Sequence, residues 1–484
     1  MKTKNYFITP AILMALASCT SDFDVVSPTQ QVEEPTPVTF GAYSAQATKT
    51  RAAIDNVGAL ATAGGFGVFA YFTDDDDYGN TSTPNFMYNQ QVTGTETSTG
   101  SGNYNWTYSP LKFWPNDIAE DNAVDKQGAD GAATGSKAGG KISFFAYAPY
   151  TENVASTGVV TGATDGITAF SKNSDTGNPT VTYKVNSANI VDLLWGTASN
   201  NNVGKVESDE NQGGTLLTNG NAKVWTNITR PEKGDKIKFN FLHALSKFGG
   251  STENIGGTEI GGVRIVLNPD AGESFGNDKE TKVTVRSIKI ETTGGDGANA
   301  ANKFYQDGTF DLATGVWTAL ATPTTITFPK QDITNGTAAA GYTKVSINSA
   351  IADNTEFSKG SAWSSLPDGV TKTPKDVYAS GRTPIYAVPV AGCQPKLTVT
   401  ITYVVRTQDN HLANGFSEAI QTIKRDVTVP VFEQNKAYGL LIKLGLTSVK
   451  FEANITNWEN GGSDTYNFGS GNTNVTIVDL PADQ

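Results

Sequence analysis

The chain has 484 residues, of which 38% are hydrophobic, 10% aromatic and only 17% charged, with 50 glycines. This composition favours strands joined by polar turns over helices, and the length suits two or three domains. A net charge of −12 repels the phosphates of nucleic acids and the headgroups of anionic membranes, so neither is expected as a direct partner.

Residues 1–18 are predicted to be a secretory signal peptide. Lys2 and Lys4 precede an apolar stretch, and small residues stand directly before Cys19. The stretch is too short to cross about 30 Å of hydrocarbon. The four residues ending at Cys19 resemble a bacterial lipobox, which implies an acylated thiol; an ordinary signal peptide with an incidental cysteine is the alternative. We expect an exported lipoprotein that contacts the membrane only through its lipid.

Residues 19–37 combine prolines with Gln, Thr and Glu, a composition that predicts a tether between the lipid and the fold. From Val38 onwards apolar and polar residues alternate, which predicts a first strand over residues 38–45. The basic, polar segment that follows contains Arg51, and we expect it to be exposed and sensitive to trypsin.

Strand-like runs then recur between turn-rich loops along the rest of the chain. They cover residues 66–73, 141–147, 191–196, 236–241, 263–267, 282–290, 397–405, 426–431, 439–446 and 449–455. Only 116–124 and 243–248 suggest short helical turns. The sequence predicts an all-β chain with an N-terminal β-sandwich over residues 38–240, a C-terminal one over 241–460 and a tail over 461–484.

Catalytic chemistry has little support in the sequence, because His243 and His411 are the only histidines. His243 lies among apolar residues, as a core histidine does, and His411 lies in a predicted turn. We therefore predict no enzyme and no cofactor. A glycoside hydrolase remains a distant alternative, because a pair of catalytic carboxylates has no spacing in sequence.

Two possible binding features have simpler explanations. The four carboxylates of Asp74, Asp75, Asp76 and Asp77 could hold calcium. They lack the spacing of a calcium loop, so a solvated loop is the simpler interpretation and no metal is predicted. Tryptophan side chains could stack on glycans if they were exposed, but most tryptophans of β proteins lie in the core.

Motifs along most of the chain, taken in order, resemble the fimbrillin family of Bacteroidia, whose subunits build type V pili. The motifs are the lipobox at Cys19 and residues 48–52, 66–71, 106–115, 142–149, 192–196, 239–248 and 455–458. The resemblance implies two transthyretin-like β-sandwich domains in tandem, and a lipoprotein precursor displayed on the outer membrane.

The resemblance also implies maturation by an arginine-specific protease that removes the lipid and the first strand. Arg51 is the matching position, so the cut falls between Arg51 and Ala52; an ordinary surface arginine is the alternative. Loss of a paired first strand exposes an apolar trench, which an extended strand of another subunit can fill.

The C-terminal tail supplies a candidate donor for this trench. Its strand-like part contains Val475, Ile477, Val478 and Leu480, and head-to-tail joining through it would propagate as a filament. An ordinary last strand is the alternative. The predicted partners are other fimbrial subunits, and possible further ones are host or bacterial surface glycans or proteins. The alternative functions are a surface lipoprotein that binds glycans without polymerising, and a tip adhesin of the fimbria.

Overall fold

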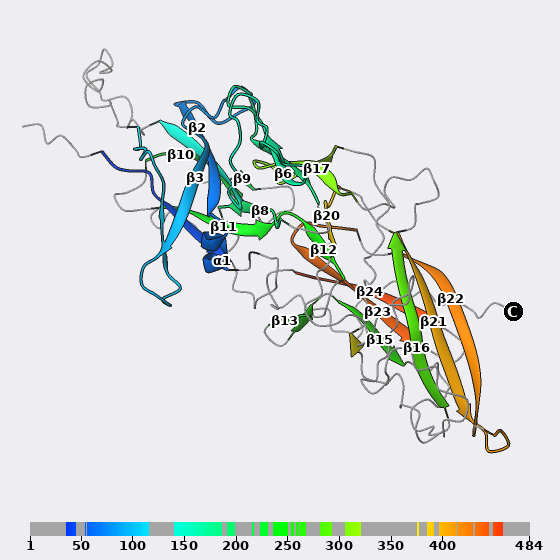
Figure 1. Cartoon of the computed structure of the whole chain (residues 1–484). Helices are drawn as coiled ribbons and strands as arrows, with labels where there is room; N and C mark the ends of the chain where they lie inside the picture. Colours follow the sequence, from blue (N-terminus) through cyan, green and yellow to red (C-terminus); the bar gives the residue numbers. More distant parts are fainter. Residues whose placement is uncertain are drawn as a thin grey trace, which may run out of the picture.

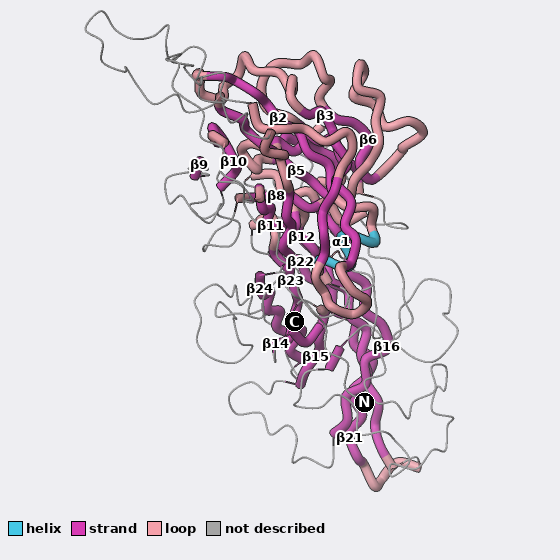
Figure 2. The backbone as a smooth tube through the Cα atoms, turned by 90° about the vertical axis from the view of Figure 1, so that its left-hand side faces the viewer, coloured by secondary structure: helices cyan, strands magenta, loops and turns pink. Residues whose placement is uncertain are grey.

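The computed structural model of the chain shows an elongated molecule built mainly of strands (Figure 1). Blue-to-green strands of the first half gather at one end, and the orange-to-red strands of the second half lie towards the other (Figure 1). Figure 2 shows the same separation from the side, with β2, β3 and β5 at one end and β21 at the other. All structural statements below concern the residues that the structure describes. These are residues 35–44, 54, 56–115, 140–185, 191–198, 215–216, 223–230, 236–249, 253–255, 258–260, 262–267, 281–292, 305–320, 375–376, 385–391, 396–413, 415–428, 431–444 and 449–457.

A closed ring of strands forms the first half. Its order is β2 (Phe66–Asp74), β3 (Met87–Glu96), β4 (Tyr104–Thr107), β1 (Phe40–Ser44), β11 (Ile237–His243), β8 (Leu194–Thr197) and β5 (Lys141–Ala148). Because β5 also pairs with β2, the path returns to its start. Within the ring only the β1 and β11 pair is parallel. The strands β10 (Lys223–Ile228) and β9 (Thr215–Leu216) extend this sheet from β5.

Alternate side chains of the ring strands face two different cores, as the two-residue period of a strand requires. In β2, Phe66 and Val68 belong to the cluster inside the ring, whereas Phe69 and Tyr71 belong to a second cluster outside it. In β5, Phe144 lies in the inner cluster. We call these clusters the inner core and the outer core. Their separation explains why β2 and β5 read as nearly continuous apolar runs in the sequence.

A four-stranded sheet covers the outer core. Its order is β18 (Trp317–Ala319), β17 (Asp307–Asp311), β7 (Thr180–Lys184) and β6 (Gly166–Phe170). The turn between β17 and β18 needs glycine at Gly315, where φ is +69° and a Cβ atom would lie 2.6 Å from the Trp195 ring. The β17 and β18 hairpin, distant in sequence, therefore completes the core of the first half.

The second half contains two larger sheets and one small one. The first joins β19 (Lys375–Asp376), β15 (Val263–Leu267), β23 (Lys436–Leu444), β12 (Ser246–Phe248), β20 (Ile385–Ala387) and β24 (Val449–Asn457). The second joins β16 (Thr281–Thr292), β21 (Lys396–Gln408) and β22 (Phe416–Thr428). A short hairpin pairs β13 (Glu253–Ile255) with β14 (Thr258–Ile260).

One helix, α1 (Val57–Thr62), is present among the described residues. The Asn56 side chain caps it by accepting a 2.8 Å hydrogen bond from Ala59 N. Only Leu60 of the helix is fully buried, so the segment lacks the apolar stripe that would mark a helix in sequence. Within the described ranges, no helix has the length and apolar character needed to span a bilayer.

The all-β fold class is confirmed, and most of the predicted strands appear close to their expected ranges. The helical turn expected at 243–248 is wrong, because β11 ends at His243 and β12 begins at Ser246. The turn expected at 116–124 lies outside the described residues. Strand β22 starts at Phe416 rather than at 426, since polar residues on both of its faces hide the strand pattern.

The tandem transthyretin-like domains and their boundaries stay predictions. Strand β17 comes from the predicted second domain but pairs with β7 of the predicted first one, and β18 pairs with β17 in the same sheet. Regular pairing also begins before the predicted first strand: Trp114 N donates to Thr36 O at 2.9 Å, although residue 36 lies within the predicted tether.

Candidate functional site

Strand β1 lies between β4 and β11 and is paired on both sides. Along β11 the register runs from Phe40 opposite Ile237 to Ser44 opposite Phe241. On the other side, Phe40 is opposite Trp106 of β4. Thr39 O accepts a 2.9 Å hydrogen bond from Ile237 N. The strand is therefore an interior member of the ring.

The chain before β1 continues this pairing along residues 112–114. Val38 N donates to Lys112 O at 2.9 Å, and Pro37 forms an antiparallel bridge with Phe113. Tyr108 Oη donates to Val38 O at 2.8 Å and accepts from Lys112 N at 3.2 Å. Burial raises the pKa of Tyr108 to about 12, and the backbone hydrogen bond with Lys112 partly opposes this shift.

Three side chains of this segment point into the inner core: Val38, Phe40 and Ala42 are 0%, 1% and 8% exposed. A set of four aromatic rings lies around Phe40, and we call it the Phe40 cage. The cage consists of Phe66, Tyr108, Phe144 and Phe239, with ring centroids 6.3, 5.4, 5.9 and 6.1 Å from that of Phe40. Fully burying a valine or phenylalanine side chain contributes about 1.5–3 kcal/mol. Without β1, several large rings would therefore lose their apolar cover.

The chain beyond the predicted cut is held at Ile54 by a buried carboxylate. Ile54 N donates to Asp192 Oδ2 at 3.0 Å, and Asp192 Oδ1 lies 3.0 Å from His243 Nδ1. Both side chains are almost completely buried. His243 therefore has the role of a core histidine that the sequence predicted, and it orients the carboxylate that holds Ile54.

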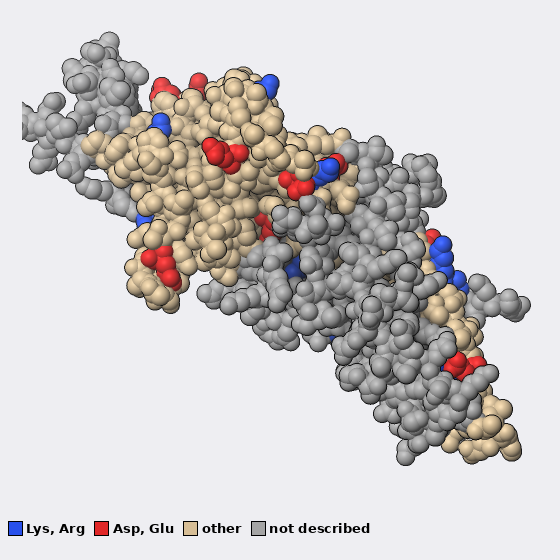
Figure 3. Space-filling model, viewed as in Figure 1, with Lys and Arg blue, Asp and Glu red and all other residues tan. Residues whose placement is uncertain are grey.

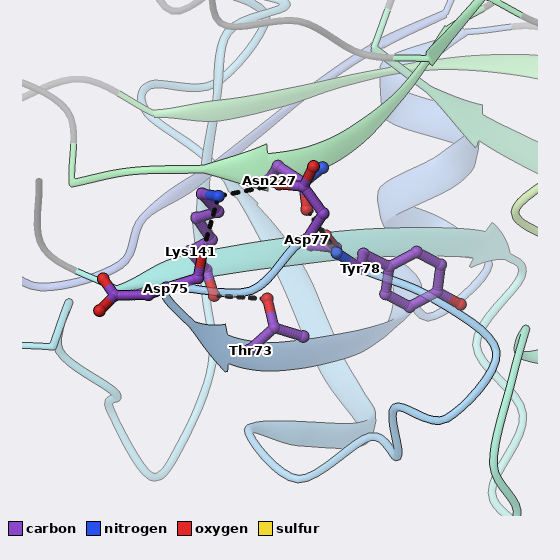
Figure 4. Close-up of polar contacts among 7 residues, drawn as sticks. Thr73, Asp75, Asp77, Tyr78, Lys141 and Asn227 are labelled. Atoms are coloured by element: carbon purple, nitrogen blue, oxygen red, sulfur yellow. Dashed lines mark hydrogen bonds and ion pairs between the residues drawn. The ribbon is translucent and has the colours of Figure 1, made fainter.

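The aspartate run after β2 forms an exposed loop. Lys141 Nζ donates to Asp77 Oδ1 at 2.8 Å and to Asp75 O at 2.9 Å, while Tyr78 N donates to Asn227 Oδ1 at 2.7 Å (Figure 4). Among the described residues, no three His, Cys, Asp or Glu side chains converge on a point that could hold a metal. On the face drawn in Figure 3, acidic side chains form several small groups.

Most of the other predicted site residues lie outside the described residues. They are Cys19, Arg51, Ala52, Val475, Ile477, Val478 and Leu480. Lipidation, processing and donation of the tail thus stay predictions. The structure brings together two features that the sequence did not reveal, the Phe40 cage and the Asp192–His243 pair. Each joins residues distant in sequence, and the only sequence signal was the apolar surroundings of His243.

Comparison with known proteins gives a curated relative and several structural neighbours. No family model matches the chain. Over 310 residues it is 26% identical to fimbrium subunit Fim1C of Phocaeicola vulgatus. The match covers 62% of this chain and 60% of the relative, so the chain spans about three fifths of the length of the curated relative that it matches.

The structural neighbours are distant. A proposed cell adhesion protein from Bacteroides uniformis aligns over 89% of this chain and 100% of its own, with 13% identity and a TM-score of 0.33. A second one, from Bacteroides fragilis, aligns over 90% and 100%, with 10% identity and a TM-score of 0.21. These scores are too low to support an argument. The curated match carries the comparison: the chain is similar to a fimbrial subunit of a Bacteroidia species, as its motifs indicated.

Proposed function

We propose that this chain is a structural subunit of a cell-surface fimbria that polymerises by strand exchange after proteolytic loss of β1. The similarity to a fimbrium subunit supports the fimbrial part. The observation that carries the mechanism is the place of β1, an interior strand of a closed ring that lies directly before the predicted cut.

Loss of β1 from a closed ring has two physical effects. It leaves the backbone of β4 and β11 unpaired on the sides where β1 lay, and it uncovers the Phe40 cage. Unpaired edges next to an apolar trench favour the addition of an extended strand, because such a strand restores both the hydrogen bonds and the burial. A neighbouring subunit supplies this strand, and repetition of the step builds a filament.

The chain is bound to the fold on both sides of the predicted cut, by different contacts on each side. Upstream of Arg51, residues 38–44 are bound by the pairing of β1 and by the buried side chains of Val38, Phe40 and Ala42. Downstream, Ile54 is bound to Asp192 and α1 follows. Cleavage between them makes β1 a separate peptide but leaves Ile54 and α1 attached to the fold. In this proposal the precursor is a lipidated outer-membrane protein, and the mature subunit is part of the fibre.

Limited trypsin digestion tests the proposal. The chain without residues 1–19 is digested, the early cut is identified by mass spectrometry, and products are followed on unheated gels and by electron microscopy. We expect a cut after Arg51, release of β1, high-mass ladders and filaments. Because trypsin also cuts after Lys49, the control carries both Lys49→Ala and Arg51→Ala, and it should stay uncut between β1 and Ile54 and monomeric.

Two further results decide between this function and its alternatives. A product that is cut after Arg51, has lost β1 and remains monomeric would refute polymerisation and favour a non-polymerising surface protein. A chain without residues 462–484 should be processed but should form no ladders. Normal ladders from this truncation would exclude the tail as the donor.

A further inference from the structure

The three-stranded sheet of the second half ends on an open edge. Strand β22 pairs with β21 along its whole length, and no described strand pairs with its other side. Figure 1 shows this sheet at the end of the molecule away from the ring, with β22 on its outer side. Residues 417–422 are all exposed, and Ile420 keeps 52% of its surface exposed. An edge of this length is a template for one more strand.

The hairpin between β21 and β22 identifies the backbone groups that point to the open edge. Asp409 N donates to Gly415 O at 2.9 Å across the turn, and the register of the two strands continues from there without a shift. Antiparallel strands alternate between hydrogen-bonded and non-hydrogen-bonded pairs. The odd-numbered residues of β22 therefore bond to β21. The N–H and C=O groups of even-numbered residues, among them Ile420, Thr422 and Lys424, point away from β21.

We propose that the open edge of β22 pairs antiparallel with β22 of a second copy of this chain, around a twofold axis at Gln421. The same edge of each copy then faces the other, and the two three-stranded sheets become one continuous sheet. The pairing covers residues 417–425 of each copy. It needs no cleavage, so it is independent of the proposed function.

The charges of β22 select this register. A twofold axis perpendicular to the sheet places Glu418 opposite Lys424 of the second copy, and the same pair recurs on the other side of the axis. Moving the axis by one residue towards the C-terminus would place Glu418 opposite Asp426, and like charges in this position destabilise a sheet. Moving it by one residue the other way would leave Glu418 opposite Thr422. The register centred on Gln421 is therefore the one that matches both charges.

The Glu418 carboxylate is already oriented on the face where Lys424 would meet it. Arg406 Nε on β21 donates to Glu418 Oε2 at 2.8 Å, and the side chains are 4% and 34% exposed respectively. The buried arginine thus fixes a carboxylate that is still accessible. A lysine on an edge usually discourages pairing, but here it completes a row of alternating charge from Arg406 through Glu418 to Lys424 of the second copy. Such a network stabilises more than an isolated surface pair does.

Uncharged side chains near the axis also gain cover in this register. Ile420 lies opposite Thr422 of the second copy, whose methyl group covers part of its exposed surface. On the other face of the sheet, the exposed Ala419 lies opposite Ile423 of the second copy. Removing this apolar surface from water favours the pairing.

The geometry determines which copies can meet. Residues 417–425 are far fewer than the roughly 20–30 residues a side of a standard interface, so a single contact is weak. The twofold axis makes the paired copies point in opposite directions. Subunits joined head to tail in one fibre all point the same way, so under the proposed function the pairing joins separate fibres. Repetition along two fibres would make many weak contacts strong together.

Charge reversal tests the pairing in the unprocessed chain without residues 1–19. Sedimentation velocity over a range of concentrations should show dimers of the parent. Lys424→Glu should weaken dimerisation at least about tenfold, because two carboxylates then face each other in both pairs. Glu418→Lys should also weaken it, by placing two ammonium groups opposite each other. An equal mixture of the two variants should restore dimers, since both pairs between unlike copies are then opposite in charge.

A matched control separates this effect from the change in net charge. Lys172→Glu makes the same charge change in an exposed loop of the first half and should leave dimerisation within about twofold of the parent. Thermal melting of each variant shows that it folds. A dimer that Lys424→Glu does not weaken, or that the mixture of variants does not restore, would overturn the inference.

A cysteine at the axis tests the register directly. With Cys393→Ser, a chain without residues 1–19 carries only the cysteine that is introduced. The exposed Gln421 lies opposite its own copy, so Gln421→Cys should form an intermolecular disulfide on mild oxidation. Ser417→Cys, also exposed, is the control without a disulfide, because its two copies would lie about 27 Å apart along the strand. A monomeric parent that gives no Gln421→Cys disulfide, or equal cross-linking at both positions, would refute the pairing.

Discussion

Strand β1 and the β17–β18 hairpin both complete the core of the first half, but they are attached in different ways. The hairpin is continuous with the chain on both sides and is fixed by two buried indoles: Trp195 Nε1 donates to Leu312 O at 2.9 Å, and Trp317 Nε1 donates to Ala244 O at 2.7 Å. Strand β1 also buries side chains, Phe40 and Ala42, in the inner core, but a predicted cut follows it. Under the proposed function, burial alone does not make an element permanent, and covalent continuity decides which of the two can be exchanged.

The largest effect is expected from Trp317→Ala in the hairpin. The change should lower the free energy of unfolding by about 3–5 kcal/mol, because it removes a buried indole and its hydrogen bond to Ala244 O. Denaturant unfolding measures it, and Trp317→Phe should cost less because a ring remains. The cost should be the same before and after trypsin processing. If the loss of stability caused by Trp317→Ala disappeared after processing, the hairpin would not differ from β1 in how firmly it is attached.

Phe40→Ala should destabilise the precursor by about 3 kcal/mol, since the ring fills the Phe40 cage. The same change should have no effect on processed subunits, because β1 is then absent from them. Unfolding of matched samples before and after processing measures both values. A full cost that persists in processed protein would show that β1 stays bound after the cut.

Asp192→Ala should cost about 1–3 kcal/mol, because it removes the acceptor of Ile54 N and the partner of His243 Nδ1 in a buried site. Asp192→Asn keeps an oxygen acceptor and should cost less. The effect should persist after processing, since Ile54 lies downstream of Arg51. Unfolding experiments on both forms measure it, and an unchanged stability of Asp192→Ala would contradict a role as an anchor.

Tyr108→Phe should have the smallest effect, about 1 kcal/mol, from loss of the hydrogen bond to Val38 O. The folded-state pKa of Tyr108, raised to about 12, exceeds the unfolded value near 10. The stabilisation by its neutral hydroxyl is thus complete below about pH 10 and is lost as pH rises through about 12. The stability difference between parent and variant should narrow over this interval. A difference that widens with pH would contradict the stated sign.

Local patterns predicted the strands that carry a clear alternation. Leu397, Val399 and Ile401 are all buried on one face of β21, as their spacing indicated. Strand β22 was predicted only in part, because Glu418, Lys424 and neighbouring polar residues lie on an exposed edge. Periodicity reports burial, so an exposed strand leaves little signal.

The sequence predicted the strand that fills the candidate site but not the rings that surround it. The alternation of Val38 and Phe40 correctly placed their side chains on one buried face. The rings that receive Phe40 come from strands and loops up to about two hundred residues away, and no local pattern specifies such pairings. For the same reason the sequence did not show that β17 and β18 cross the predicted domain boundary.

The pairing of β2 with β5 closes the ring, and this closure affects when subunits can assemble. The closed ring of described strands offers another chain no unpaired strand, so under the proposed function precursor copies do not join through this site before cleavage. Under the proposed function, crowding alone does not trigger fibre growth at the ring. In this proposal the protease determines when and where assembly starts, and because the cut is irreversible, a processed copy cannot return to the closed ring.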